Sequence, residues 1–275
     1  MKVLISVDLE GISGIVHPTE TNPDRYDYER GRALMTAEAN AAVAGVLDAE
    51  PDAVVWVADA HGSFRNIVPE DLDRRAHLVR GKPRPLGMLA GLDEHTDAVL
   101  LIGYHARAGA GPAVLAHTMS DAILDVRVAG RSVGEIGLNV AMAGHLDVPV
   151  VLLSGDDTAC TEFSGLVPSA VTVAVKRTLG QAAAVALHPQ EARERLRHGA
   201  ADAIARRASI PPAKMAGPLD VEVDLYGPYM VDLAVLVPGV TRVGGGRTVA
   251  FHAADVAETY RLVQLLVQLA SIKPS

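Results

Sequence analysis

Four continuous apolar runs, each followed by polar residues, constrain the fold of this chain more than any other feature. The runs occupy residues 2–7, 54–57, 98–102 and 148–153, and segments with helical periodicity, such as residues 28–47, lie between them. An uninterrupted apolar strand is typical of a sheet that is buried on both faces. The pattern therefore predicts an α/β fold, in which a mostly parallel sheet is flanked by helices.

The second half of the chain has a more mixed pattern. It contains a predicted hairpin at 122–132, a charged helix at 189–207, an alternating strand at 221–225 and a terminal helix at 255–269. We expect residues 1–155 to form an α/β subdomain that carries the functional groups. Residues 156–275 are expected to form a second, smaller α+β subdomain that completes the fold.

Polar side chains follow three of the apolar runs at corresponding positions. Asp8 and Glu10 follow the first run, His61 the second and His105 the third. Asp8 and Glu10 are two residues apart in an extended segment, so they point to the same face. Because the carboxyl ends of parallel strands meet at one edge of a sheet, the four side chains are expected to converge there. Imidazole and carboxylate ligands are typical of zinc, with manganese or cobalt as alternatives.

Two further residues have both an ordinary and a functional interpretation. Glu135 begins a predicted helix, where the helix dipole by itself favours a carboxylate. His117 follows a loop that contains glycine and proline, and it could act as an acid or base or be a buried histidine within a strand. For Asp156 and Asp157 helix capping is the preferred interpretation, and the glycines at 244–246 are interpreted as a turn.

The composition excludes several classes of partner and site. The formal net charge is −8, which disfavours binding to nucleic acid or to an anionic membrane surface. Cys160 is the only cysteine, so an intrachain disulfide and a thiolate metal cluster are excluded. The apolar run at residues 3–7 is too short for a signal peptide or a membrane span, and we therefore expect a cytoplasmic protein.

Several motifs, taken together and in order, resemble the D-aminopeptidase family of dinuclear zinc metallopeptidases, which were formerly described as dipeptide transport proteins. The first is Ser-Val-Asp-Leu-Glu-Gly-Ile-Ser-Gly at residues 6–14. The others lie at residues 28–32, 35–40, 103–107, 133–139, 154–157 and 174–176. An ordered set of motifs is more specific than any one of them. The resemblance covers most of the chain and weakens after about residue 180.

The resemblance implies a site, an activity and an assembly. Two zinc ions per chain would be held by five ligands, with His117 as a catalytic residue: Asp8 as the bridge, Glu10, His61, His105 and Glu135. The enzyme would hydrolyse the N-terminal residue of short peptides through a metal-bridging water, with a preference for D-amino acids. It would also form a homo-oligomer as large as a ring-shaped decamer.

Two other functions remain compatible with the residues themselves. Paired metal ions also serve phosphoesterases, although Arg107 is the one basic residue that follows a predicted ligand closely. A metal-stabilised, non-catalytic peptide-binding protein is the other alternative, and the lack of a recognisable secretory signal disfavours it. Peptide cleavage that depends on metal and on His117 would distinguish the aminopeptidase from both.

Overall fold

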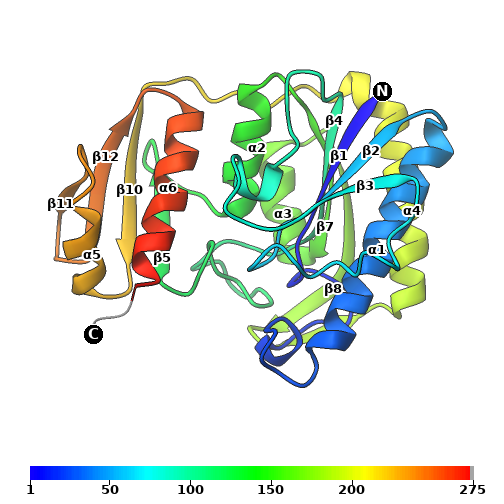
Figure 1. Ribbon diagram of the computed structural model, residues 1–275, viewed down its shortest axis with the longest axis horizontal. Helices are drawn as coiled ribbons and strands as arrows, with labels where there is room; N and C mark the ends of the chain where they lie inside the picture. The colour runs from blue at the N-terminus through cyan, green and yellow to red at the C-terminus, as the bar shows by residue number, and fades with distance from the viewer. Residues whose placement is uncertain (273–275) are drawn as a thin grey trace.

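The chain folds around two β-sheets. The structure is a computed structural model that describes residues 1–272. A seven-stranded sheet has the order β3-β2-β1-β4-β7-β8-β9, and a five-stranded sheet has the order β11-β12-β10-β5-β6. Figure 1 shows the larger sheet on the right and the smaller one on the left. The expected α/β class, with a mostly parallel sheet flanked by helices and a smaller second part, is confirmed.

The larger sheet is parallel except for β9, which pairs with β8 in the antiparallel direction. Helices α1 (Tyr28–Ala49) and α4 (Pro189–Arg206) cover one face, and α2 (Glu135–His145) and α3 (Asp157–Leu166) cover the other (Figure 1). This coverage explains why the central strands are apolar along their whole length. The strands are β1 (Lys2–Val7), β2 (Val54–Asp59), β3 (Ala76–Val79), β4 (Ala98–Tyr104), β7 (Val150–Asp156), β8 (Val171–Gly180) and β9 (Ala183–Ala186).

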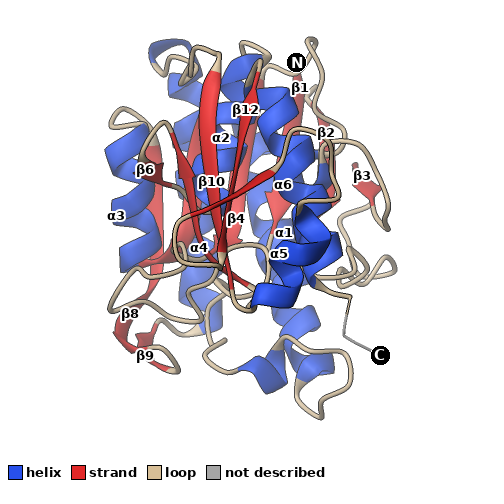
Figure 2. Ribbon diagram, turned by 90° about the vertical axis from the view of Figure 1, so that its left-hand side faces the viewer, coloured by secondary structure: helices blue, strands red, loops and turns tan. Residues whose placement is uncertain are grey.

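The smaller sheet is antiparallel and buries one face. Along β10 buried residues alternate with more exposed ones, as expected for a sheet that packs on one side. Helix α6 (Val256–Ala270) lies against this sheet and also packs on α2, and it thereby joins the two halves of the molecule (Figures 1 and 2). The remaining elements are β5 (Ile123–Val128), β6 (Arg131–Ser132), β10 (Leu219–Leu225), α5 (Pro228–Ala234), β11 (Thr241–Val243), β12 (Thr248–Ala253) and the short 3-10 helices η1 (Pro18–Glu20), η2 (Gly87–Leu89) and η3 (Arg207–Ser209).

The two sheets draw their strands from both sides of the expected boundary at residue 155. The hairpin β5–β6 precedes that position and lies in the smaller sheet, whereas β8 and β9 follow it and lie in the larger sheet. Asp156 caps α3 by accepting a hydrogen bond from the Ala159 amide, as its sequence position indicated. No helix within residues 1–272 has both the length and the apolar character that crossing a membrane requires.

Strand register aligns the polar residues that follow the strands. Val7 at the end of β1 pairs with Asp59 at the end of β2 and with Ile102 near the end of β4. Beyond the strands, the Gly11 amide donates to the Gly103 carbonyl at 2.7 Å. A Cβ atom at Gly11 would lie 2.1 Å from the Tyr104 carbonyl oxygen, so only glycine allows this approach. The loop after β1 is therefore held directly against the end of β4.

Candidate metal centre

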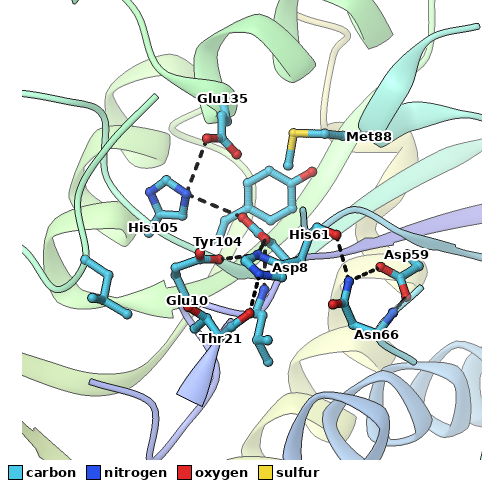
Figure 3. Close-up of polar contacts among 12 residues, drawn as sticks. Asp8, Glu10, Thr21, Asp59, His61, Asn66, Met88, Tyr104, His105 and Glu135 are labelled. Atoms are coloured by element: carbon cyan, nitrogen blue, oxygen red, sulfur yellow. Dashed lines mark hydrogen bonds and ion pairs between the residues drawn. The ribbon is translucent and has the colours of Figure 1, made fainter. Parts of the chain in front are cut away.

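Asp8 lies between two histidines that come from neighbouring strands. Its Oδ1 is 3.3 Å from Nδ1 of His61, and its Oδ2 is 3.5 Å from Nε2 of His105 (Figure 3). His61 follows β2 and His105 follows β4, so the parallel register brings each of them beside the end of β1. The two oxygens of the Asp8 carboxylate therefore face two different imidazoles.

Two further carboxylates complete the cluster from opposite sides. Oε2 of Glu10 is 2.9 Å from Nδ1 of His61, and Oε1 of Glu135 is 3.4 Å from Nε2 of His105. Glu135 is the first residue of α2, and its Oε1 also accepts a hydrogen bond from the Met119 amide. The helix start and the strand ends therefore meet at one place, and all three carboxylates are buried.

His117 lies beside this cluster in the loop between β4 and β5. Its ring stacks on that of His105, with centroids 4.1 Å apart, and its Nε2 is 3.8 Å from Oε1 of Glu135. Unlike the buried His105, the His117 side chain keeps 22% of its surface exposed and lines a cavity. All six residues that the sequence singled out are thus brought together.

Each histidine has one ring nitrogen beside a backbone carbonyl. Nε2 of His61 is 2.9 Å from the Thr21 oxygen, Nδ1 of His105 is 3.0 Å from the Ala106 oxygen, and Nδ1 of His117 is 2.9 Å from the Leu115 oxygen. A carbonyl can only accept, so the facing nitrogen carries the hydrogen. In a neutral ring the other nitrogen then has a lone pair, and that lone pair points toward the carboxylates. This arrangement is typical of histidines that bind a metal ion.

Several buried atoms of the cluster have no hydrogen-bond partner among the described residues. They are Oδ2 of Asp8, Oε2 of Glu10 and Nε2 of His105. Burial, reinforced by the Glu10 carboxylate, raises the pKa of Asp8 to about 7. Burial alone would lower the pKa of His105, but the Glu135 carboxylate raises it to about 10. The raised pKa values of Asp8 and His105 show that this group of carboxylates favours added positive charge, and a divalent cation could supply that charge in place of protons.

The ligand atoms form two overlapping groups of a size that suits metal ions. One group consists of Asp8, Glu10 and His105, and the other of His105, His117 and Glu135. Within each group the candidate ligand atoms lie within 4.8 Å of one another. Oxygen and imidazole nitrogen are both good ligands for zinc. The residues present therefore fit a zinc centre.

The turn that carries His61 is held by a carboxylate that sequence reasoning did not assign a role. Oδ2 of Asp59 accepts the Ile67 amide at 2.7 Å, and Oδ1 accepts Nδ2 of Asn66 at 2.7 Å. The same Asn66 Nδ2 lies 2.7 Å from the His61 carbonyl oxygen (Figure 3). Asp59 is fully buried, and it fixes the path of the chain on either side of His61. The sequence signal for this role was the position of Asp59 two residues before His61.

Lys176 holds the loop that carries Glu10. It is buried on β8, and its Nζ donates to the carbonyl oxygens of Glu10 at 2.5 Å, Ile12 at 3.0 Å and Ile15 at 2.6 Å. Burial lowers the pKa of Lys176 to about 8, although nearby carboxylates counteract this effect. Three parallel donations from one ammonium group leave the loop little freedom. The sequence signal for this contact was a lysine directly after the valine-rich run at residues 171–175.

Replacing Lys176 with methionine is expected to destabilise the protein and loosen the Glu10 loop. Methionine fills similar volume but removes the ammonium donor from three buried carbonyl oxygens, of which the Ile12 oxygen keeps the Ile15 amide, so the free energy of unfolding should fall by about 3 kcal/mol. Urea denaturation with zinc present would measure the loss. Lys214→Met is the matched control, because Lys214 is exposed and pairs with Asp147 at the surface. A loss below about 1 kcal/mol in Lys176→Met would contradict the assigned contact.

The cluster opens into a cavity of about 520 Å³. Asp8, His61, His117 and Glu135 form part of its wall, and residues of α6 such as Gln264 form another part. A cavity of this size is typical of a small-molecule site. Because the buried cluster reaches the surface of this cavity, a ligand that enters it would meet the carboxylates and imidazoles directly.

Comparisons with known proteins agree with this geometry. Residues 1–265 match peptidase family M55, described as D-aminopeptidase. A D-aminopeptidase of Bacillus subtilis (strain 168) is 36% identical over 274 residues, which cover 98% of each chain. The solved structure of the Zn-dependent D-aminopeptidase DppA from Bacillus subtilis, described as a self-compartmentalizing protease, superimposes with a TM-score of 0.96 at 34% identity and covers 100% of both chains.

The family match spans nearly the whole chain, and the identity to the D-aminopeptidase exceeds what fold similarity alone would require. The cluster of carboxylates and imidazoles lies within the matched residues. This chain therefore belongs to peptidase family M55, the D-aminopeptidase family, and is a hydrolase.

Proposed function

We propose that this protein is a zinc-dependent aminopeptidase that removes the N-terminal residue from short peptides, with a preference for D-amino acids. The observation that carries the proposal is the position of Asp8, whose two oxygens face His61 on one side and His105 on the other. That position suits a carboxylate that bridges two metal ions. The zinc dependence and the D-aminopeptidase activity named for the two relatives support the same proposal.

In the proposed site two zinc ions would be held by Asp8, which would be shared between them, and by Glu10, His61, His105 and Glu135. Bound there, the ions would supply Lewis-acid polarisation of the scissile carbonyl and would lower the pKa of the attacking water. The protein contributes orientation, because the Thr21 and Ala106 carbonyls fix the ring nitrogens of His61 and His105 that face the carboxylates.

His117 is proposed to act on the substrate rather than to bind metal. Its Nδ1 hydrogen is directed at the Leu115 carbonyl, and its Nε2 lies at the cavity wall. When the ring carries hydrogens on both nitrogens, Nε2 can donate its proton to the leaving amine or a hydrogen bond to the developing oxyanion. Stacking on the His105 ring restricts the orientation of His117 and thus the direction of that hydrogen bond.

We also infer that copies of the chain assemble into a homo-oligomer as large as a ring-shaped decamer. The self-compartmentalizing nature of the solved relative supports this inference. Light scattering on the purified protein tests it, and a mass equal to one chain of 28.8 kDa would overturn it.

Matched dipeptides of D-alanine and L-alanine test the proposed activity and its stereochemistry. An N-terminal residue held through its amino group and its carbonyl can place only one enantiomer's side chain in a given pocket. We expect kcat/KM to favour the D-peptide by about 100-fold, which corresponds to about 2.7 kcal/mol. Amine release would be followed with zinc-loaded protein and after chelation. Equal rates for both enantiomers would remove the D-preference, and no release from either would remove the aminopeptidase assignment.

A further inference from the structure

The loop between β3 and η2 supplies two cationic side chains, Lys82 and Arg84, to the wall of the catalytic cavity. The same part of the wall contains Phe64, which lies three residues after His61. The two cations differ in what their charged groups contact. That difference indicates which of them is available to a ligand.

Arg84 is occupied by the protein itself. Its guanidinium donates to the carbonyl oxygens of Gly87 at 2.8 Å, Val79 at 3.1 Å and Asp59 at 2.5 Å. It also lies over the Phe64 ring, 4.1 Å from the centroid. All three of its nitrogens are therefore engaged, and Arg84 serves to hold the loop in place against the end of β2.

Lys82 has no such engagement. Its side chain is exposed, and within residues 1–272 its Nζ has no carboxylate partner. The Nζ lies 5.6 Å from the centroid of the Phe64 ring, close enough for a cation–π attraction that positions the charge without neutralising it. Lys82 is thus a free positive charge at the wall of the cavity.

Backbone hydrogen bonds fix this charge relative to the metal cluster. The Phe64 amide donates to the His61 carbonyl at 2.8 Å, which closes the turn that carries the proposed ligand. The Gly81 amide donates to the Phe64 carbonyl at 2.6 Å, and Gly81 immediately precedes Lys82. Two consecutive contacts therefore connect His61 to the backbone beside Lys82, so the chain position that carries the ammonium group is fixed relative to the cluster.

A short peptide carries an ammonium group at one end and a carboxylate at the other, and two or three extended residues span about 7–11 Å. If the N-terminal residue is held at the metal cluster, the carboxylate of such a peptide still lies within or near the cavity. The protein has a net charge of −8, so an anionic end needs a local cation to enter. We propose that Lys82 binds the C-terminal carboxylate of a short peptide substrate and thereby selects free dipeptides and tripeptides. This inference rests on the proposed function.

The test compares D-Ala-D-Ala with D-Ala-D-Ala amide, which lacks the terminal charge. The measured quantity is the ratio of kcat/KM for the free acid to kcat/KM for the amide. We expect Lys82→Met to lower this ratio about tenfold, Lys82→Glu to lower it further, and Lys82→Arg to retain most of it. The effect should appear mainly in KM, and it should shrink as added salt screens the charge.

Lys214→Met is the matched control, because it removes one positive charge from a lysine that is exposed and pairs with Asp147. The control should leave the ratio at the wild-type value. A ratio that Lys82→Met and Lys82→Glu leave unchanged, while the wild type cleaves both peptides, would overturn the role of Lys82 alone. Wild-type protein that cleaves neither peptide would overturn the proposed function, and this inference with it.

Discussion

Asp8→Asn lowers the zinc content of the protein and reduces kcat/KM for a D-alanyl dipeptide by about 1,000-fold or more: this is the largest effect we expect. Asparagine has one oxygen in place of two, and its amide nitrogen turns hydrogens toward an imidazole nitrogen. It therefore cannot offer one oxygen ligand on the side of His61 and a second on the side of His105. Loss of a shared ligand should remove at least one ion, and with it several kcal/mol of transition-state stabilisation.

Metal analysis of the purified variant, together with steady-state kinetics, would measure both effects. Asp157→Asn is a suitable control because Asp157 also follows a strand of the larger sheet, but its Oδ1 accepts the Thr178 amide and faces no histidine. The control should retain the zinc content of the wild type. Asp8→Asn protein that kept two zinc ions and more than a tenth of its activity would refute the bridging role.

His117→Ala is expected to lower kcat by about 100-fold to 10,000-fold while leaving the zinc content intact. His117 lines the cavity, so the loss of its imidazole removes the proton donor or hydrogen bond that is proposed to act on the reacting groups. KM should change little, because binding of the peptide does not depend on that hydrogen bond in the ground state.

The geometry makes this variant a sharp test, because His117 also belongs to a group of side chains that could hold a metal ion with His105 and Glu135. Zinc content therefore distinguishes the two roles. A His117→Ala protein that lost one ion per chain would show that His117 is a ligand. His145→Ala, at an exposed position near the end of α2, is the control and should change neither kcat nor metal content.

Much of the larger sheet could be predicted from the sequence, because its central strands are buried on both faces and are therefore continuously apolar. The predicted helices near 28–47, 189–207 and 255–269 correspond to α1, α4 and α6, and the helix predicted to begin at Glu135 corresponds to α2. Two short strands, β3 and β9, were not predicted. Each has four residues and lies at an edge of the sheet, where burial is incomplete and the apolar pattern is weak.

Helix α5 was also missed, and only the capping residue of α3 was predicted, for a related reason. Helices α3 and α5 have ten and seven residues, which gives too few turns for a clear period. The residues at their N-caps are Asp156 for α3 and Gly227 for α5. Asp156 was interpreted as a cap, and the structure confirms that it accepts from the Ala159 amide.

The sequence by itself determined that Asp8, Glu10, His61 and His105 would meet, since residues that follow parallel strands must share one edge of the sheet. It also identified Glu135 and His117, although only through resemblance to a family. The tertiary structure alone decided that Glu135 faces His105 and that Lys176 holds the Glu10 loop across 166 residues of chain. It also decided that Lys82 stands free beside Phe64. The physical reason is that strand pairing follows a local pattern, whereas contacts between a loop, a helix start and a distant strand depend on how the layers pack.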